Sequence, residues 1–280
     1  MQNKLIKSPL NYTGGKYKLL PQLLPLFPKD INTFIDLFTG GCNVAVNVNA
    51  KKIIANDLYN QVIEVYDGIK KMGTKESIKS IEETSKKFNL SKTNKEGYYS
   101  IRNYYNLGNK EWYVFYTLVA HAFSNQIRFN KKGEYNMPFG ERYFNPKLKQ
   151  NFINFANAIQ DKNIIFTNKD FREFNVDNLN KNDFVYLDPP YLITCASYNE
   201  QNGWNENLEK ELLKLCDKLN ERNVKFALSN VLEHKGNKNE ILINWSKQYK
   251  IHNLNYNYNN SNYHSTAKNN KTIEVLITNY

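Results

Sequence analysis

Short apolar runs alternate with amphipathic stretches over much of this chain. The apolar runs predict strands at 33–38, 52–55, 163–167, 184–187, 225–229 and 273–278. Apolar residues at helical spacing predict helices at 60–72, 75–88, 113–123, 208–219 and 238–245, and short ones at 19–24 and 44–47. Near the N-terminus the order is strand, glycine turn, helix, strand and acidic residue. That order is typical of a doubly wound α/β sheet.

The alternation of strands and helices is interrupted from about Gly73 to residue 146. Within this stretch, segment 125–140 carries Gly and Pro punctuation and alternating polar and aromatic residues, which predicts a hairpin or an ordered loop. We therefore expect an inserted, mainly helical subdomain at 73–146, between two parts of one α/β domain at 1–72 and 147–280. A polar, Asn-rich connection at 257–271 is expected to lead into the last strand.

The composition excludes several classes of protein. A hydrophobic fraction of 41% and a mean hydropathy of −0.67 fit a soluble globular protein. No apolar run approaches the ~20 residues of a membrane span, and the first residues lack the apolar stretch of a signal peptide. Cys42, Cys195 and Cys216 are widely spaced, and the histidines show no metal-ligand spacing. We therefore expect an intracellular, cytoplasmic protein with neither a disulfide framework nor a metal site.

The charge balance points to an anionic partner. The formal net charge is +11 and the isoelectric point is near 9.3. Aromatic residues make up 14% of the chain, including twenty tyrosines. Basic residues interleaved with aromatic ones suit phosphate contact and base stacking, so we expect nucleic acid rather than a membrane as the partner.

The most informative stretch is Asp188-Pro189-Pro190-Tyr191, which follows the predicted buried strand 184–187. The prolines lack N–H donors and fix φ, so the chain must leave the strand in an extended conformation. The Asp188 carboxylate and the Pro189 carbonyl are then held at the end of the strand, with the Tyr191 ring beside them. This corner suits a planar group that carries an exocyclic amine. These four residues alone fit a proline turn with a capping Asp equally well.

Two further patterns suit a nucleoside. A Gly-Gly turn follows the strand that contains Asp36, and Asp57 ends the next strand about twenty residues later. Glycines allow close approach to a ligand, and the acidic residue can accept hydrogen bonds from both hydroxyls of a ribose. This is not a GxGxxG fingerprint, so a nucleoside without a diphosphate fits better. Upstream, Tyr12 and Lys16 flank a second Gly-Gly turn. The Tyr12 ring can stack on an adenine, and the Lys16 ammonium can pair with a carboxylate. Each pattern alone also fits an ordinary turn.

The predicted hairpin carries groups that can contact DNA. Arg128 and Asn130 alternate with apolar residues, and Lys131 and Lys132 follow them. Arg and Asn are the side chains that contact guanine and adenine edges with two hydrogen bonds, and Lys contacts phosphates. A solvated basic hairpin is the alternative.

Taken in this order, segments 12–16, 36–42, 128–140 and 188–191 resemble the Dam-type DNA adenine-N6 methyltransferases, and the resemblance extends over nearly the whole chain. It implies a Rossmann-like methyltransferase core, dependent on S-adenosylmethionine, with an inserted target-recognition subdomain. By similarity, the cofactor-binding residues are Tyr12, Lys16, Asp36, Phe38, Gly40, Asp57, Asp170, Phe171 and Asp188. The catalytic motif is Asp188, Pro189, Pro190 and Tyr191. The DNA-binding residues are Asn11, Arg128, Asn130, Lys131 and Lys132.

The resemblance implies methyl transfer to N6 of a flipped adenine in double-stranded DNA, by a bacterial or phage enzyme that acts alone or beside a cognate restriction endonuclease. Cys42 stands where the family often has glycine, and Asn11 stands where members that methylate GATC often carry Lys. The recognised sequence is therefore left open. The alternatives are an RNA or cytosine-N4 methyltransferase and a non-catalytic DNA-binding regulator with a vestigial cofactor site.

Overall fold

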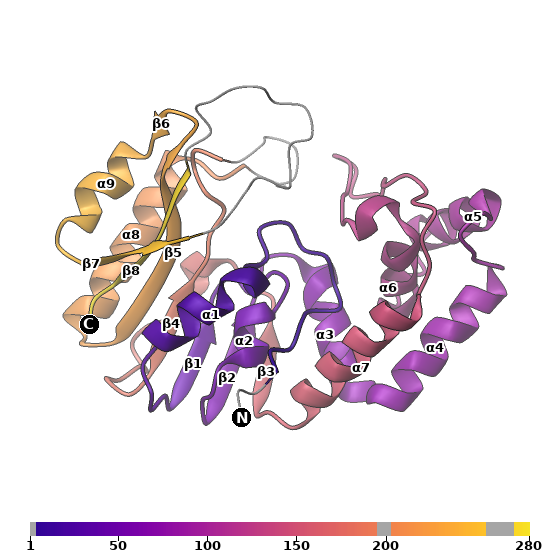
Figure 1. Cartoon of the computed structure of the whole chain (residues 1–280), viewed down its shortest axis with the longest axis horizontal. Coiled ribbons are helices and arrows are strands. Elements are labelled where there is room, and N and C mark those ends of the chain that lie inside the picture. The colour runs from indigo at the N-terminus through magenta and orange to yellow at the C-terminus, as the bar shows by residue number, and fades with distance from the viewer. Residues whose placement is uncertain (1–3, 195–202, 256–271) are drawn as a thin grey trace. The chain divides into compact units, whose positions relative to one another are not determined.

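The computed structural model describes residues 4–194, 203–255 and 272–280, and the expected connection at 257–271 therefore lies outside the described residues. Its contacts divide the chain into two compact units (Figure 1). Unit 1 consists of Met1–Tyr17, Thr39–Asn47 and Asp57–Asn168. Unit 2 consists of Lys18–Phe38, Val48–Asn56 and Lys169–Tyr280. The chain passes between the units several times within its first 60 residues.

Unit 2 is built on a mostly parallel sheet. Its strands are β1 (Thr33–Asp36), β2 (Lys52–Asn56), β4 (Phe184–Leu187), β5 (Lys225–His234), β6 (Asn237–Lys238), β7 (Lys250–Leu254) and β8 (Thr272–Thr278). They follow the order β2-β1-β4-β5-β8-β7, and β6 pairs with β5. The pairs from β2 to β5 are parallel, whereas β8 runs antiparallel to β5 and to β7. The helical elements of this unit are α1 (Leu20–Leu23), η2 (Leu24–Leu26), η4 (Phe171–Glu173), α8 (Glu206–Glu221) and α9 (Glu240–Ser246).

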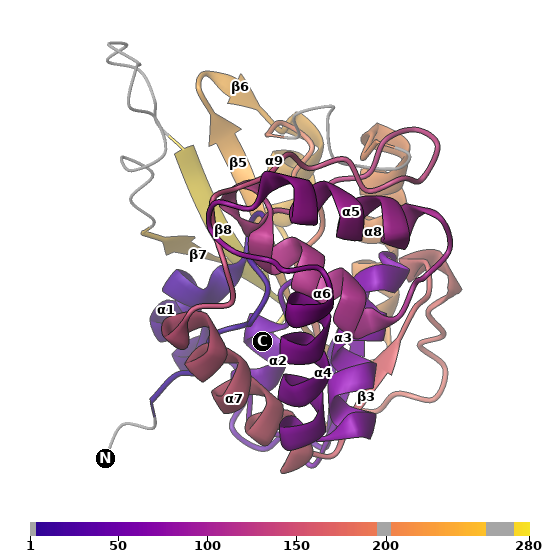
Figure 2. The ribbon, with the colours of Figure 1, turned by 90° about the vertical axis from the view of Figure 1, so that its right-hand side faces the viewer.

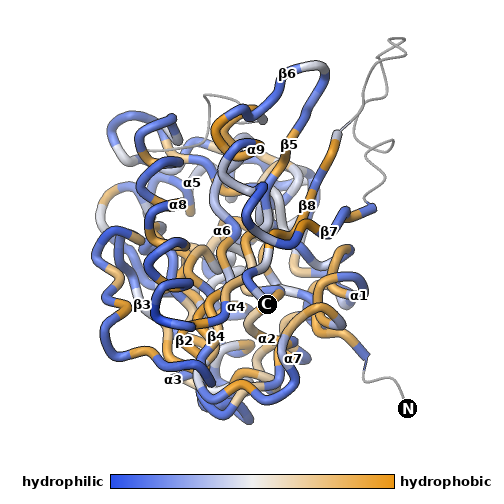
Figure 3. Tube along the Cα trace, turned by 90° about the vertical axis from the view of Figure 1, so that its left-hand side faces the viewer, coloured by the Kyte–Doolittle hydropathy of each residue, from blue (hydrophilic) through white to orange (hydrophobic). Residues whose placement is uncertain are grey.

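Side chains on the strands of unit 2 alternate between two faces, as a pleated strand requires. On the first face, Phe34 and Tyr186 pack near Phe27, which follows η2. On the second face, Val185 and Leu187 join the apolar cluster formed by α8. Because α8 and α9 cover one face and the α1–η2 segment covers the other, β4 is buried along its whole length. In Figure 3 the tube beside the labels β2 and β4 is mostly orange, which marks hydrophobic residues.

Unit 1 is mainly helical. It contains α2 (Asn43–Asn47), α3 (Asn60–Met72), α4 (Thr74–Lys87), α5 (Lys95–Asn106), α6 (Trp112–His121), η3 (Phe123–Asn125) and α7 (Pro146–Gln160), together with strand β3 (Ile164–Thr167). The central helix is α6, which contacts α3, α4 and α5 (Figure 2). All of its residues from Val114 to His121 are buried, as expected for a helix that is apolar on every side.

Most predicted elements are confirmed, but several were missed. The helix at 60–72 and the strand at 184–187 have the predicted bounds. The strand predicted at 33–38 ends at Asp36. Helices α5 and α7 and strands β6 and β7 were not predicted. Helix α5 is apolar mainly through tyrosine side chains, and its start is capped by Asn94, whose side chain accepts from Gly97 N. Helix α7 is also capped by an Asn, Asn145, and it has a proline, Pro146, in its first turn.

Within the described part of the chain, no helix is both long enough and apolar enough to cross a bilayer.

Candidate active site

The chain reverses its winding direction between β1 and β4 in unit 2. These two parallel strands are neighbours, and their ends are joined by Leu37 N donating to Tyr186 O at 3.0 Å. The strand that follows β1 in the chain, β2, lies on one side of the pair, and the strand that follows β4, β5, lies on the other. In open α/β sheets, ligands bind beyond the carboxyl ends of the strands at this kind of reversal. Phe38 and Asp188 each lie directly beyond one of the two strands.

The Asp188 carboxylate is held by Tyr191. The Tyr191 hydroxyl lies 3.0 Å from Asp188 Oδ1 and 3.1 Å from Glu274 Oε1. Asp188 and Tyr191 are half-buried, and Glu274 on β8 is buried. Burial raises the pKa of Tyr191 well above its usual value, and the neighbouring carboxylates of Asp188 and Glu274 raise it further. Tyr191 therefore remains a neutral hydrogen-bond donor to the carboxylate.

A layer of acidic groups lies around Tyr186 on the first face of the sheet. The Tyr186 hydroxyl is buried and hydrogen-bonds to Ser229 Oγ at 2.8 Å. Burial raises the pKa of Tyr186, and the charges of Asp188, Asp36 and Glu274 raise it further. Three carboxylates thus create a negative environment at this end of β1, β4 and β8. Such an environment favours a cationic ligand group.

Asp170 and Phe171 lie at the start of η4 in unit 2. The Asp170 carboxylate accepts from Arg172 N at 2.9 Å and also pairs with the Arg172 guanidinium at 2.7 Å, which lowers the pKa of Asp170. Phe171 is 7% exposed, and its ring centroid lies 5.6 Å from that of Phe38. Unit 2 therefore brings Phe38 and Phe171 together, as a shared role of the two residues requires.

Tyr12, Gly40 and Asp57 lie together in unit 1. Asp57 Oδ2 accepts from Gly40 N at 2.7 Å, and Asp57 Oδ1 accepts from Tyr59 N at 2.9 Å. Burial raises the pKa of Asp57, although these backbone N–H groups oppose the shift. A Cβ on Gly40 would lie 2.9 Å from the Tyr12 ring, and the φ of Gly40 is +44°. Only glycine fits this position without strain.

Cys42 and Lys16 each lie beside one of the two Gly-Gly turns. Cys42 has a φ of 55°, a left-handed conformation that glycine adopts at lower cost. This explains why glycine is frequent at this position in the resembled family. The Lys16 side chain is 6% exposed, and its ammonium donates to Gly14 O at 3.0 Å. The lysine is thus folded back onto its own turn.

Segment 125–140, which the sequence predicted to be a hairpin or an ordered loop, is an ordered loop with isolated bridges. Phe129 bridges to Tyr135, and Asn130 N donates to Glu134 O at 2.9 Å. The side chain of Asn130 forms the turn, because its Oδ1 accepts from Lys132 N and from Glu134 N. Lys131 and Lys132 are exposed at the tip.

Two other predicted DNA-contacting side chains bond within unit 1. The Arg128 guanidinium donates to Asn136 Oδ1 at 2.7 Å and to Asn136 O at 3.0 Å. The Asn11 amide donates to Ser124 O at 2.8 Å. The structure therefore keeps both side chains close to the loop, with Arg128 bracing its two arms.

Helix α5 holds the loop at 125–140 through hydrogen bonds to its backbone. Asn106 donates to Tyr135 O at 3.0 Å and accepts from Tyr135 N at 2.9 Å. Tyr98 donates to Met137 O at 2.8 Å. These contacts were missed in the sequence because α5 itself was missed. Glu274 was also missed, since nothing in the run 273–278 distinguishes it from an ordinary strand residue.

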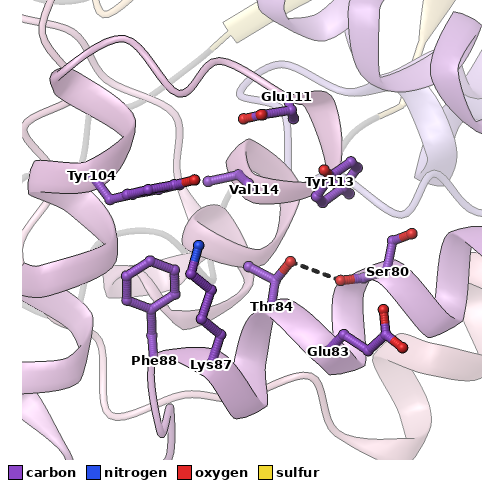
Figure 4. A pocket seen from close by; sticks show the side chains of 9 residues that line it. All are labelled: Ser80, Glu83, Thr84, Lys87, Phe88, Tyr104, Glu111, Tyr113 and Val114. Carbon is purple, nitrogen blue, oxygen red and sulfur yellow. Dashed lines mark hydrogen bonds between the residues drawn. The ribbon is translucent and has the colours of Figure 1, made fainter.

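A hollow of about 350 Å³ lies among α4, α5 and α6 (Figure 4). The Lys87 ammonium points into it and lies 4.2 Å from the centroid of the Tyr104 ring. None of the predicted site residues lines this hollow. Among the residues that the structure describes, no group of three or more His, Cys, Asp or Glu side chains is placed to hold a metal ion.

Comparison with known proteins gives a family match over most of the chain. Residues 12–260 match the model of the D12 class N6 adenine-specific DNA methyltransferases. Over 99% of its length, the chain is 50% identical to "Type II methyltransferase M.FokI" of Planomicrobium okeanokoites and 45% identical to "Modification methylase StsI" of Streptococcus sanguinis. Over 79% of its length, it is 26% identical to a "DNA adenine methylase" of Salmonella typhi, covering 79% of that protein. The chain spans 43% of the length of each of the first two relatives.

Proposed function

Because this chain belongs to the D12 class N6 adenine-specific DNA methyltransferase family, we propose that it methylates N6 of a specific adenine in double-stranded DNA with S-adenosylmethionine as the methyl donor. The observation that carries this proposal is the Asp188 carboxylate, held by the Tyr191 hydroxyl at 3.0 Å directly beyond β4. A carboxylate fixed at this point of an α/β sheet faces the place where ligands bind.

The chemistry falls to Asp188 and Pro189. The adenine amine is a poor nucleophile because its lone pair is delocalised into the ring. The Asp188 carboxylate and the Pro189 carbonyl accept the two N6–H hydrogens and favour a tetrahedral nitrogen, which frees the lone pair. The bound cofactor supplies the methyl group from its sulfonium. The methyl group would pass from the sulfonium to N6, and the proton that N6 loses would pass to water. Positioning and electrostatics carry this catalysis.

The residues present fit the cofactor. Asp57 accepts two hydrogen bonds from Gly40 and Tyr59, and an ionised carboxylate has about four acceptor positions. It can therefore also accept from ribose hydroxyls. The acidic layer that includes Asp36 and Asp188 suits the positively charged sulfonium and amino groups of S-adenosylmethionine. We assign the nucleoside to Tyr12, Gly40 and Asp57, its adenine to Phe38, Asp170 and Phe171, and the methionine carboxylate to Lys16.

We assign DNA recognition to segment 73–146. Lys131 and Lys132 are exposed at the tip of the loop and suit phosphate contact. Arg128, Asn130 and Asn11 complete the proposed DNA-binding set. The target adenine must leave the helix to reach Asp188, and the Tyr191 ring can stack on it there. The partner proposed for this activity is a cognate restriction endonuclease, because two relatives are named as a Type II methyltransferase and a modification methylase.

The deciding experiment expresses this chain in a host that lacks DNA methylation and maps N6-methyladenine across the genome. We expect methylation at one short motif, which also identifies the recognised sequence. An Asp188→Ala variant that folds and still binds cofactor should leave the DNA unmethylated. Methylation at cytosine N4, or wild-type methylation by the Asp188→Ala variant, would refute the proposal.

A further inference from the structure

Three aromatic rings form a cluster beyond the strand ends of unit 2. The Trp204 ring lies 5.9 Å from the Phe38 ring with an edge-on geometry, and 5.6 Å from the Phe171 ring. Phe38 and Phe171 are themselves 5.6 Å apart, so each ring contacts both others. Phe38 and Trp204 are only half-buried. The cluster therefore presents aromatic surface near the carboxyl end of β1, where a ligand is expected.

Trp204 is held in place by a buried carboxylate. Glu209 on α8 is 0% exposed, and its Oε2 accepts from Trp204 Nε1 at 2.6 Å. Its Oε1 accepts from Asn230 on β5 at 3.1 Å and from Asn239 at 2.9 Å. One carboxylate oxygen thus ties α8 to β5 and to the start of α9, while the other is used by the indole. Burying a carboxylate is unfavourable unless it is hydrogen-bonded, and burial raises the pKa of Glu209.

The structural tie alone does not account for the indole bond. The two asparagines already connect α8, β5 and α9 through Oε1, and an apolar residue at 204 could pack against Phe38 and Phe171. A short hydrogen bond from the indole N–H to a carboxylate instead fixes the plane of a half-buried ring. The side chain of Asn205, which accepts from Asn207 N and from Leu208 N, also fixes the backbone next to this tryptophan.

We propose that Trp204 is a binding residue for the adenine ring of the cofactor, which it contacts together with Phe38 and Phe171, and that Glu209 is the positioning residue that orients the indole. This inference rests on the proposed function, which assigns Phe38 and Phe171 to that adenine. An aromatic residue held in one orientation binds a planar purine without losing side-chain freedom on binding. The hydrogen bond to Glu209 also makes the indole N–H unavailable to other acceptors.

The test is calorimetric binding of S-adenosylmethionine to the full chain and its variants. Trp204→Ala should raise the Kd by about five- to a hundredfold, the range expected for loss of one aromatic stack. Trp204→Phe should raise it less. The matched control is Trp245→Phe, because Trp245 belongs to the same unit and also donates to a carboxylate, Asp217, at 2.8 Å. This control should keep the wild-type Kd.

The positioning role is tested by a double-mutant cycle. Glu209→Gln places an amide N–H against one of three donors, and it should raise the Kd in the wild-type background. It should have no further effect when Trp204 is already alanine, whereas a purely structural role would give additive losses. Cofactor should also change the tryptophan fluorescence of wild type and of Trp245→Phe, but not that of Trp204→Phe.

The outcomes separate the two proposals. If wild type fails to bind S-adenosylmethionine, the proposed function fails and this inference fails with it. If wild type binds but Trp204→Phe and Trp204→Ala keep its Kd, only the role of Trp204 is refuted. A Trp204→Ala variant that raises the KM for DNA while the cofactor Kd is unchanged would place the ring at the target adenine instead, and would also overturn the inference.

Discussion

Replacing Tyr191 with phenylalanine separates the two roles that this residue can have. The ring that would stack on the flipped adenine is retained, but the hydroxyl that lies 3.0 Å from Asp188 and 3.1 Å from Glu274 is lost. A hydrogen bond to a charged group contributes about 1.5–3 kcal/mol. Asp188 and Tyr191 are half-buried, so the lower value applies. About 1.5 kcal/mol corresponds to roughly a tenfold fall in kcat.

The assay is single-turnover methylation of a duplex that contains the mapped motif, at saturating DNA and cofactor. We expect Tyr191→Phe to lower the transfer rate about tenfold with little change in the Kd for DNA. Tyr191→Ala should lower the rate and also weaken binding of the flipped base. A Tyr191→Phe enzyme that transfers methyl groups at the wild-type rate would show that the hydroxyl does not orient Asp188.

Three further predictions concern unit 1. Burial raises the pKa of Asp57, so Asp57 should take up a proton at a higher pH than an exposed Asp. The affinity for the cofactor should therefore fall as the pH falls through this raised pKa. An affinity that rises instead would contradict the role of Asp57 at the ribose. Asn106→Ala removes two hydrogen bonds to Tyr135 and should lower the free energy of unfolding by about 1–2 kcal/mol and raise the KM for DNA several-fold, while calorimetry should find the cofactor Kd unchanged. Gly140→Ala would place a Cβ 2.2 Å from the backbone oxygen of Ala122 and should destabilise the protein by about 1–3 kcal/mol in urea unfolding; a wild-type midpoint would show that the loop can move away.

The sequence predicted the elements that carry a strong apolar pattern and missed those that do not. Strand β4 is four buried residues between polar ones, and its pattern is unambiguous. Helix α5 buries Tyr98, Ile101 and Tyr105, but tyrosine is amphipathic, so its spacing gives a weak signal. Strand β7 contains a single buried residue, Leu254, because it lies at the edge of its sheet. Such edge strands form through pairing with a neighbour that lies far away in sequence.

The sequence predicts which side chains of one strand share a face, but it does not predict the order of the strands in the sheet, and the candidate site depends on both. Along a strand, alternate residues share a face, so Tyr186 and Asp188 had to lie on the same side of the sheet. The same alternation tells which residues of the same strand share a face with Asp36, Ser229 or Glu274. It does not tell which strands are neighbours. Only the order β1-β4-β5-β8 brings the Ser229 hydroxyl to Tyr186 and the Glu274 carboxylate to Tyr191. The polar layer around Asp188 is therefore a consequence of strand order, and local sequence motifs cannot reveal a residue such as Glu274.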